Sequence, residues 1–92
     1  MENIEELSKY LKAISDPTRL KIIKLLSDHK HPICVNSISN KLNVTQSAIS
    51  QHLRILKQLD LVFSDRAGYH IHYKVNRKRL GLVVRHLETF IK

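Results

Sequence analysis

Two amphipathic patterns open the chain. In the first, apolar residues recur at spacings of three and four, at Ile4, Leu7, Leu11 and Ile14. This spacing predicts a helix over about residues 3–14 with one apolar stripe. A second helix is expected after "SDP", where Asp16 can cap free backbone N–H groups and Pro17 suits the first helical position. The broad apolar face of this helix holds Leu20, Ile22, Ile23, Leu25 and Leu26.

Two further helical patterns follow, separated by a very short break. The first, "NSISNKL", starts at Asn36, a good N-cap residue, and ends at Leu42. After "NV", the hydroxyl of Thr45 can cap a longer helix over about residues 45–59. Its expected buried side holds Ile49, Leu53 and Leu56, flanked by Ile55 and Leu59. Two helices joined by a turn of about three or four residues are typical of a helix-turn-helix.

The period then changes from helical spacing to alternation. The stretch "LVFSDRAGYHIHYKV" predicts a β-hairpin over about residues 61–75, with Gly68 free to take a positive φ at its turn. A last helix is expected over about residues 77–91, with an apolar stripe of Leu80, Val83, Val84, Leu87 and Ile91. The order of elements predicts one domain over residues 1–92. Its fold class is mainly α, an α+β winged helix-turn-helix with an added helix at each end.

The first and last helices show apolar stripes for which a chain of 92 residues offers no second layer. One small core cannot easily cover both stripes. We therefore expect a two-fold homodimer in which these two dimerisation helices pack across the axis. The alternative is that both stripes fold back onto the core of their own chain.

Charge gives the first indication of function. The chain holds 16 Lys and Arg against 8 Asp and Glu, a formal charge of +8. Residues 1–16 carry four acidic side chains and two lysines, so residues 17–92 carry 14 basic and 4 acidic side chains, a net charge of +10. A field of this sign attracts polyanions, nucleic acid before a membrane surface. The alternative is a solvated basic surface without a partner.

The outer face of the longer helix carries short, uncharged side chains that can donate and accept hydrogen bonds, whereas an ordinary surface helix would favour Glu and Lys. Its N-terminal part is expected to contact base edges through Gln46, Ser47, Ser50 and Gln51. Thr45 and Arg54 are expected to contact phosphates of double-stranded DNA. No acidic residue lies between Asp28 and Asp60 to repel them. At the hairpin tip, contacts to a minor groove or the backbone are expected from Arg66, Tyr69 and His70.

Other classes of protein find little support. The single cysteine, Cys34, excludes an intramolecular disulfide, and no apolar run approaches the roughly 18 residues of a membrane span. We expect a cytoplasmic protein without a membrane partner. The sequence shows no Gly-rich phosphate loop, no paired carboxylates and no nucleophile with a base at a readable spacing, so neither an enzyme nor a cofactor is expected.

Three stretches together resemble the ArsR/SmtB family of dimeric winged-helix repressors: "ISDPTRLKIIKLL", "TQSAISQHLRILKQLDLV" and "RAGYHIHYKV". The resemblance runs over about residues 7–91. It implies a homodimer that represses an operon by binding an inverted repeat near the promoter. Many members release DNA when a metal, a metalloid, an oxidant or a sulfur species binds.

The resemblance also implies that the usual metal sites of the family are missing. Soft-metal sensors carry two cysteines where this chain has Cys34 and Asn36, and a neutral amide is a poor replacement for a thiolate. The zinc and cobalt ligands of other members fall on Arg77 and Arg79 and near Phe90. Dithiol sensors need two cysteines in each subunit. The inducer is therefore unknown.

Three alternatives remain open, two of which concern "HKHPICV". A metal could bind His29, His31 and Cys34, although their H-x-H-x-x-C spacing is not standard. Oxidation of the Cys34 thiol could act as a switch, or the winged helix could bind protein instead of DNA. The favoured interpretation is that apolar neighbours bury Cys34, raise the pKa of its thiol and leave it inert. The other imidazoles, His52, His70, His72 and His86, are expected to be packed or surface groups.

Overall fold

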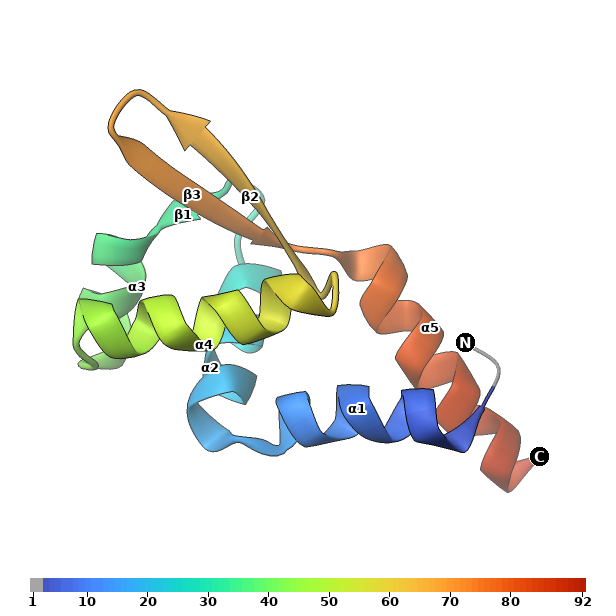
Figure 1. Ribbon diagram of the computed structural model, residues 1–92. Helices are drawn as coiled ribbons and strands as arrows, with labels where there is room; N and C mark the ends of the chain where they lie inside the picture. The colour runs from blue at the N-terminus through green and yellow to red at the C-terminus, as the bar shows by residue number, and fades with distance from the viewer. Residues whose placement is uncertain (1–2) are drawn as a thin grey trace.

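The computed structural model describes residues 3–92, which form five α-helices, a short 3₁₀-helix and one three-stranded sheet (Figure 1). In chain order these are α1 (Ile4–Ser15), α2 (Pro17–Ser27), β1 (Ile33–Cys34), α3 (Val35–Leu42), α4 (Gln46–Gln58), β2 (Val62–Ala67), β3 (His70–Val75), α5 (Arg77–Glu88) and η1 (Thr89–Ile91). The predicted winged helix-turn-helix fold is confirmed. Within this range no helix combines the length and apolar character needed to cross a membrane.

The N-terminal caps of the helices follow the sequence at two predicted positions and depart from it at one. Asp16 Oδ2 accepts a hydrogen bond from the N–H of Arg19 at 3.0 Å, and Thr45 Oγ1 accepts one from the N–H of Ala48 at 3.2 Å. The expected cap at Asn36 is wrong, because α3 begins at Val35, two residues before the Ser37 start that a cap at Asn36 would give. Its N-cap position is Cys34, whose side chain makes no capping bond.

The sheet has the order β1-β3-β2 with antiparallel neighbours. The hairpin of β2 and β3 is the predicted wing, in which Ala67 pairs with His70 across a two-residue turn. Gly68 has a φ of +65° at that turn, as expected. Strand β1 was not predicted. It places Cys34 opposite His72 and holds this segment extended immediately before α3.

The core confirms the predicted buried side of α4. Ile49, Leu53 and Leu56 have no exposed surface. They pack in one apolar cluster with side chains of the other helices and the sheet, including Leu7, Ile22, Leu26, Ile38, Leu61, Val62 and Val83. Ile55, expected to flank the buried side, is 37% exposed. In α2, Leu20 is likewise half-exposed, although Ile22, Ile23 and Leu26 are buried.

The molecule is elongated, with extents of 44 × 21 × 21 Å. Figure 1 shows the start of α4 and the tip of the wing at one end. The start of α1 and the end of α5 lie at the opposite end. The two surfaces for which the sequence predicts partners therefore lie at opposite ends of the molecule.

The apolar stripes of the end helices are divided between the core and the surface. In α1 the buried residues are Leu7, Tyr10 and Ala13, whereas Ile4 and Leu11 are exposed. The predicted amphipathic helix is confirmed, but its apolar side is wider than the expected stripe, and only the part with Tyr10 and Ala13 reaches the core together with Leu7. In α5 only Val83 is fully buried. Exposed apolar residues of both helices and η1 make up what we call the end surface: Ile4, Leu11, Val84, Leu87, Phe90 and Ile91.

Candidate nucleic-acid interface

The polar face of α4 points outward along its whole length. Its exposed residues include Gln46, Ser47, Ser50, Gln51, Arg54 and Gln58. The opposite side of the helix rests on the three fully buried residues Ile49, Leu53 and Leu56. A helix held in this way presents its polar side chains from a firm support, which recognition of base edges requires.

A tight turn sets the direction in which α4 begins. Asn43 takes a left-handed conformation with a φ of 55°, which Asn tolerates better than most residues. The hydroxyl of Ser39 donates to the carbonyl of Val44 and closes the turn. Thr45 then caps α4 by accepting from Ala48, while the N–H groups of the helix's first turn lack intrahelical acceptors. This end of the helix suits a phosphate.

The wing tip and the start of α4 line the same cleft. A cleft of about 240 Å³, here called the wing cleft, is lined by Cys34, Val35, Asn36, Gln46, Ser50, Tyr69, His70 and Ile71. The fold therefore brings together four of the predicted DNA contacts: Gln46, Ser50, Tyr69 and His70. Tyr69 is 99% exposed at the turn. Arg66 in β2 and Arg54 farther along α4 are also exposed but lie outside this cleft.

Sequence reasoning missed Asn36 as a residue of this interface. It was assigned a capping role, but its exposed side chain lies in the first turn of α3 and lines the wing cleft. The missing signal was β1, because two residues are too few to show an alternating pattern. With that strand recognised, the predicted start of α3 would lie before Asn36, and Asn36 would not have been assigned a capping role.

The acidic residue of the wing does not face the wing cleft. Asp65 lines a separate hollow with Pro32, Phe63, Ser64, His72 and Lys74. Among the described residues, the cleft itself is lined by no carboxylate. The electrostatic field at the wing cleft is therefore compatible with a phosphate backbone.

Cys34 differs from its predicted environment. Its side chain is only half-buried, and its Sγ lies 3.4 Å from Ser37 Oγ. The Ser37 hydroxyl, together with backbone N–H groups at the start of α3, lowers the pKa of the thiol below its ordinary value. The expected rise of the pKa by burial is wrong, because the sulfur sits at a helix N-terminus rather than among apolar side chains.

The proposed ligands of the "HKHPICV" stretch are not brought together. His29 is exposed, with Nδ1 2.7 Å from the carbonyl oxygen of Leu25, and His31 is exposed. Over residues 3–92, no three His, Cys, Asp or Glu side chains gather as a metal site would need. The metal alternative built on His29, His31 and Cys34 therefore lacks its geometry.

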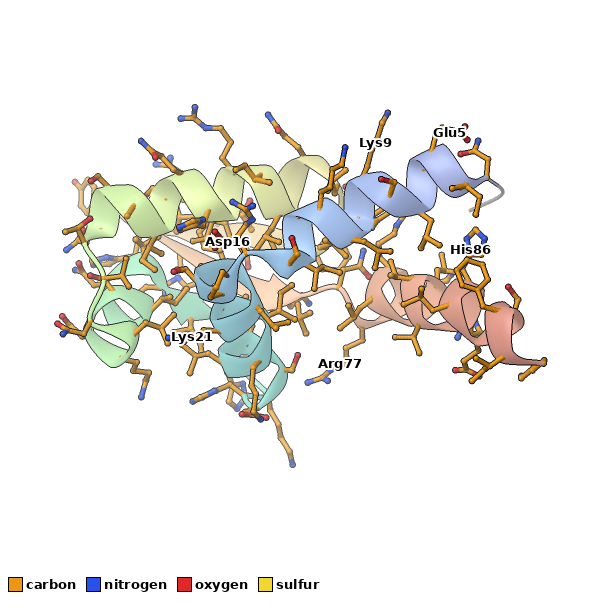
Figure 2. All side chains as sticks on the ribbon, turned by 90° about the horizontal axis from the view of Figure 1, so that it is seen from below. Glu5, Lys9, Asp16, Lys21, Arg77 and His86 are labelled. Atoms are coloured by element: carbon orange, nitrogen blue, oxygen red, sulfur yellow. The ribbon has the colours of Figure 1, made fainter. Side chains whose placement is uncertain are left out.

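The arginines at the start of α5 hold helices in place. Arg77 Nη2 donates to the carbonyl of Ser27 in α2 at 2.7 Å, and Figure 2 shows Arg77 reaching from α5 toward α2. Arg79 Nη1 donates to the hydroxyl of Tyr10 in α1 at 3.1 Å. Both positions, which the family resemblance aligns with metal ligands, thus carry structural hydrogen bonds between helices.

Comparison with known proteins agrees with this architecture. The model of the bacterial regulatory protein arsR family matches residues 16–64, which is more than half of the chain. The transcriptional repressor SdpR of Bacillus subtilis (strain 168) is 35% identical over 85 residues, covering 92% of each chain. The structure of an ArsR-like transcriptional regulator from Rhodococcus sp. RHA1 has a TM-score of 0.80 and 31% identity, covering 94% of this chain and 79% of that one.

Another solved structure shares the fold of this chain at lower sequence identity. The homodimeric winged helix-turn-helix DNA-binding domain of a possible ArsR-family regulator from Mycobacterium bovis has a TM-score of 0.76 at 22% identity. It covers 94% of this chain, and this chain spans 79% of it. The chain therefore belongs to the ArsR family of bacterial regulatory proteins, a family of DNA-binding transcriptional regulators and not of enzymes.

Proposed function

We propose that this protein is a homodimeric repressor that recognises an inverted-repeat operator by inserting α4 into the major groove. The observation that carries the proposal is the short polar face of α4, held over three fully buried residues beside the wing. The net charge of +10 on residues 17–92 supports a polyanionic partner. Sequence-specific binding then requires that individual side chains distinguish bases.

The side chains of α4 divide into two groups by reach and chemistry. Gln46, Ser47, Ser50 and Gln51 form the group that contacts base edges. A Gln side chain can bond adenine through two hydrogen bonds, and Ser accepts or donates with less discrimination. Thr45 and Arg54 form the second group, which contacts phosphates and fixes the register of the helix on the duplex.

The wing contributes contacts beside the recognised groove. Arg66, Tyr69 and His70 are exposed on the hairpin, and the last two share the wing cleft with Gln46 and Ser50. This common cleft supports a role in which the wing contacts the backbone or minor groove next to the bases that α4 reads. The guanidinium of Arg66 suits the negative potential of a narrow minor groove.

Dimerisation is assigned to the end surface on α1, α5 and η1. Its apolar side chains include Ile91, which is 85% exposed, and Ile4, which is 61% exposed. Exposed apolar patches with a polar surround mark association sites. The homodimeric fold relative from Mycobacterium bovis supports a two-fold assembly. In such a dimer two α4 helices would meet successive major grooves, about 34 Å apart.

A thiol-responsive form of the repressor is the second candidate function. The lowered pKa of Cys34 and its position in the wing cleft favour it over the metal-responsive form. Alkylation or oxidation of the thiolate would add atoms to the cleft between α4 and the wing. In this form of the proposal, modification of Cys34 would lower the affinity for DNA. Where the adduct is reversible, reduction would remove it and restore the affinity.

Selection from a random duplex library with the purified protein tests the main proposal. We expect enrichment of an inverted repeat, bound with an affinity that falls steeply as salt rises. Weak binding that is independent of sequence at low salt would contradict it and favour a protein partner for the winged helix. Mapping of bound sites across the genome would then place the operator beside the regulated genes.

A further inference from the structure

Arg19 joins three helices at one corner of the molecule. Its Nε donates to the carbonyl of Ala13 in the last turn of α1 at 2.7 Å. Its Nη1 lies 3.2 Å from Nδ1 of His52 in α4. Its backbone N–H donates to the carboxylate of Asp16, which Figure 2 shows where the α1–α2 junction meets α4. A single side chain in α2 therefore links α1 directly to α4.

The chemistry of this link determines which group donates. A guanidinium donates hydrogen bonds but cannot accept one, so in this contact Arg19 Nη1 is the donor and His52 Nδ1 the acceptor. The nearest carboxylate oxygen, on Asp16, is 3.9 Å from the same nitrogen, which is beyond hydrogen-bond distance. Arg19 is thus the hydrogen-bond partner of Nδ1.

His52 is the residue of α4 that Arg19 contacts. It is half-buried and follows Gln51, which is exposed on the polar face. Leu53 and Leu56 support the buried side of the helix through apolar contacts, which have no directional preference of their own. A hydrogen bond has an angular preference. The bond from Arg19 therefore adds a directional connection between α4 and the last turn of α1.

We propose that Arg19 and His52 are positioning residues that hold α4 in a defined orientation relative to α1 and thereby set the half-site spacing that the dimer accepts. This inference rests on the proposed function, in which α1 lies at the two-fold axis. One base pair adds about 3.4 Å along the duplex, and the two recognition helices must match the separation of successive major grooves. A loosened link between α1 and α4 would relax that requirement without changing the groups that read each half-site.

Two substitutions break the link and two serve as controls. Arg19→Lys keeps the charge, but its single nitrogen cannot replace the fork that bonds Ala13 and His52 together. His52→Leu removes the acceptor, whereas His52→Gln restores an acceptor oxygen and is the rescue variant. His31→Leu repeats the same substitution at an exposed position and is the matched control.

The DNA assay uses the inverted repeat selected by the wild-type protein, the same repeat with one base pair added or removed, and a duplex holding a single half-site. For Arg19→Lys and His52→Leu we expect the preference for the selected spacing to fall about fivefold or more, with half-site affinity within about twofold of wild type. His52→Gln and His31→Leu should behave as wild type. An equal loss on all duplexes, or an unchanged spacing preference, would overturn the inference.

A second measurement needs no DNA. Spin labels at Lys9→Cys in α1 and Lys57→Cys in α4, in a Cys34→Ser background, report the distance between the helices when labelled chain is diluted with unlabelled chain. We expect a broader distribution in Arg19→Lys and His52→Leu and a wild-type distribution in His52→Gln. Unchanged widths in both would overturn the positioning role. If the distance distribution broadens in both variants but the wild-type protein selects no duplex, the link between α1 and α4 is supported and the proposed function fails.

Discussion

Substitution of Phe90 tests the proposed dimer, and the expected change in the dimer Kd can be calculated from the exposed area of this side chain. The side chain is 57% exposed and lines a hollow of about 380 Å³ with Ile4, Leu7 and Leu11. An aromatic side chain has about 200 Å² of surface, so about 110 Å² of Phe90 is exposed to solvent and would be buried in the dimer. At about 25 cal/mol per Å², complete burial contributes about 3 kcal/mol per chain, of which Phe90→Ala should lose about 2.

A two-fold dimer holds two copies of Phe90, so the loss becomes about 4 kcal/mol, or about a thousandfold rise in the dimer Kd. The lost translational and rotational freedom is the same for both proteins and cancels in the comparison. Sedimentation velocity over a concentration series measures this Kd. Circular dichroism checks that the monomer stays folded, because the ring also contacts His86 edge-on at 6.0 Å between centroids.

Tyr69→Ala is the matched control for this experiment. It removes another exposed aromatic side chain, 99% exposed at the wing tip and far from α5. We expect its dimer Kd to equal that of the wild type. If Phe90→Ala also dimerises within about threefold of the wild type, the end surface is not the interface and the reasoning from exposed apolar area fails.

Three further predictions concern single side chains. Gln51→Ala should lose about 1–3 kcal/mol of discrimination at one base position, whereas Arg54→Ala should weaken binding to operator and random duplexes alike. Fluorescence anisotropy with both duplexes separates these effects. Equal losses for both variants would contradict the division of α4 into base-reading and phosphate-contacting residues. Alkylation of Cys34 by iodoacetamide should be faster in the wild type than in Ser37→Ala at the same pH, because the Ser37 hydroxyl lowers the pKa of the thiol; identical rates by mass spectrometry would argue against it. Asp16→Asn should melt below the wild type at neutral pH, because the Arg19 N–H lowers the pKa of the carboxyl in the folded state. The folded chain therefore binds fewer protons than the unfolded chain, and this stabilisation is present above the ordinary pKa of 3.8 and disappears as the pH falls through the lowered value. A difference in melting temperature that persists in strong acid would refute this assignment.

Local patterns in the sequence predicted the elements that carry the DNA-binding face. The helical period of α4 separates Ile49 and Leu53 from Ser50 and Gln51, and these pairs lie on the buried and exposed sides as expected. The alternation of the wing and the glycine of its turn predicted β2 and β3 equally well. These features depend on neighbours within a few residues, which a sequence displays directly.

Short elements and contacts between distant segments were not visible in this way. Strand β1 has two residues and exists because β3 pairs with it, so the environment of Cys34 was predicted wrongly. The helical period of α1 indicated an apolar stripe but not that Tyr10 and Ala13 would complete its buried face. Which apolar residues meet the core depends on where the other helices lie.

The sequence by itself determined the winged helix-turn-helix, the polar face of α4 and the basic character of the chain, because periodicity, capping and charge are local or additive properties. The tertiary structure decided the wing cleft, the lowered pKa of Cys34 and the exposed end surface. It also decided the link between Arg19 and His52, which are 33 residues apart in the chain. That link forms only when packing brings α2 against α4, since a hydrogen bond depends on distance and angle, and no residue pattern encodes them.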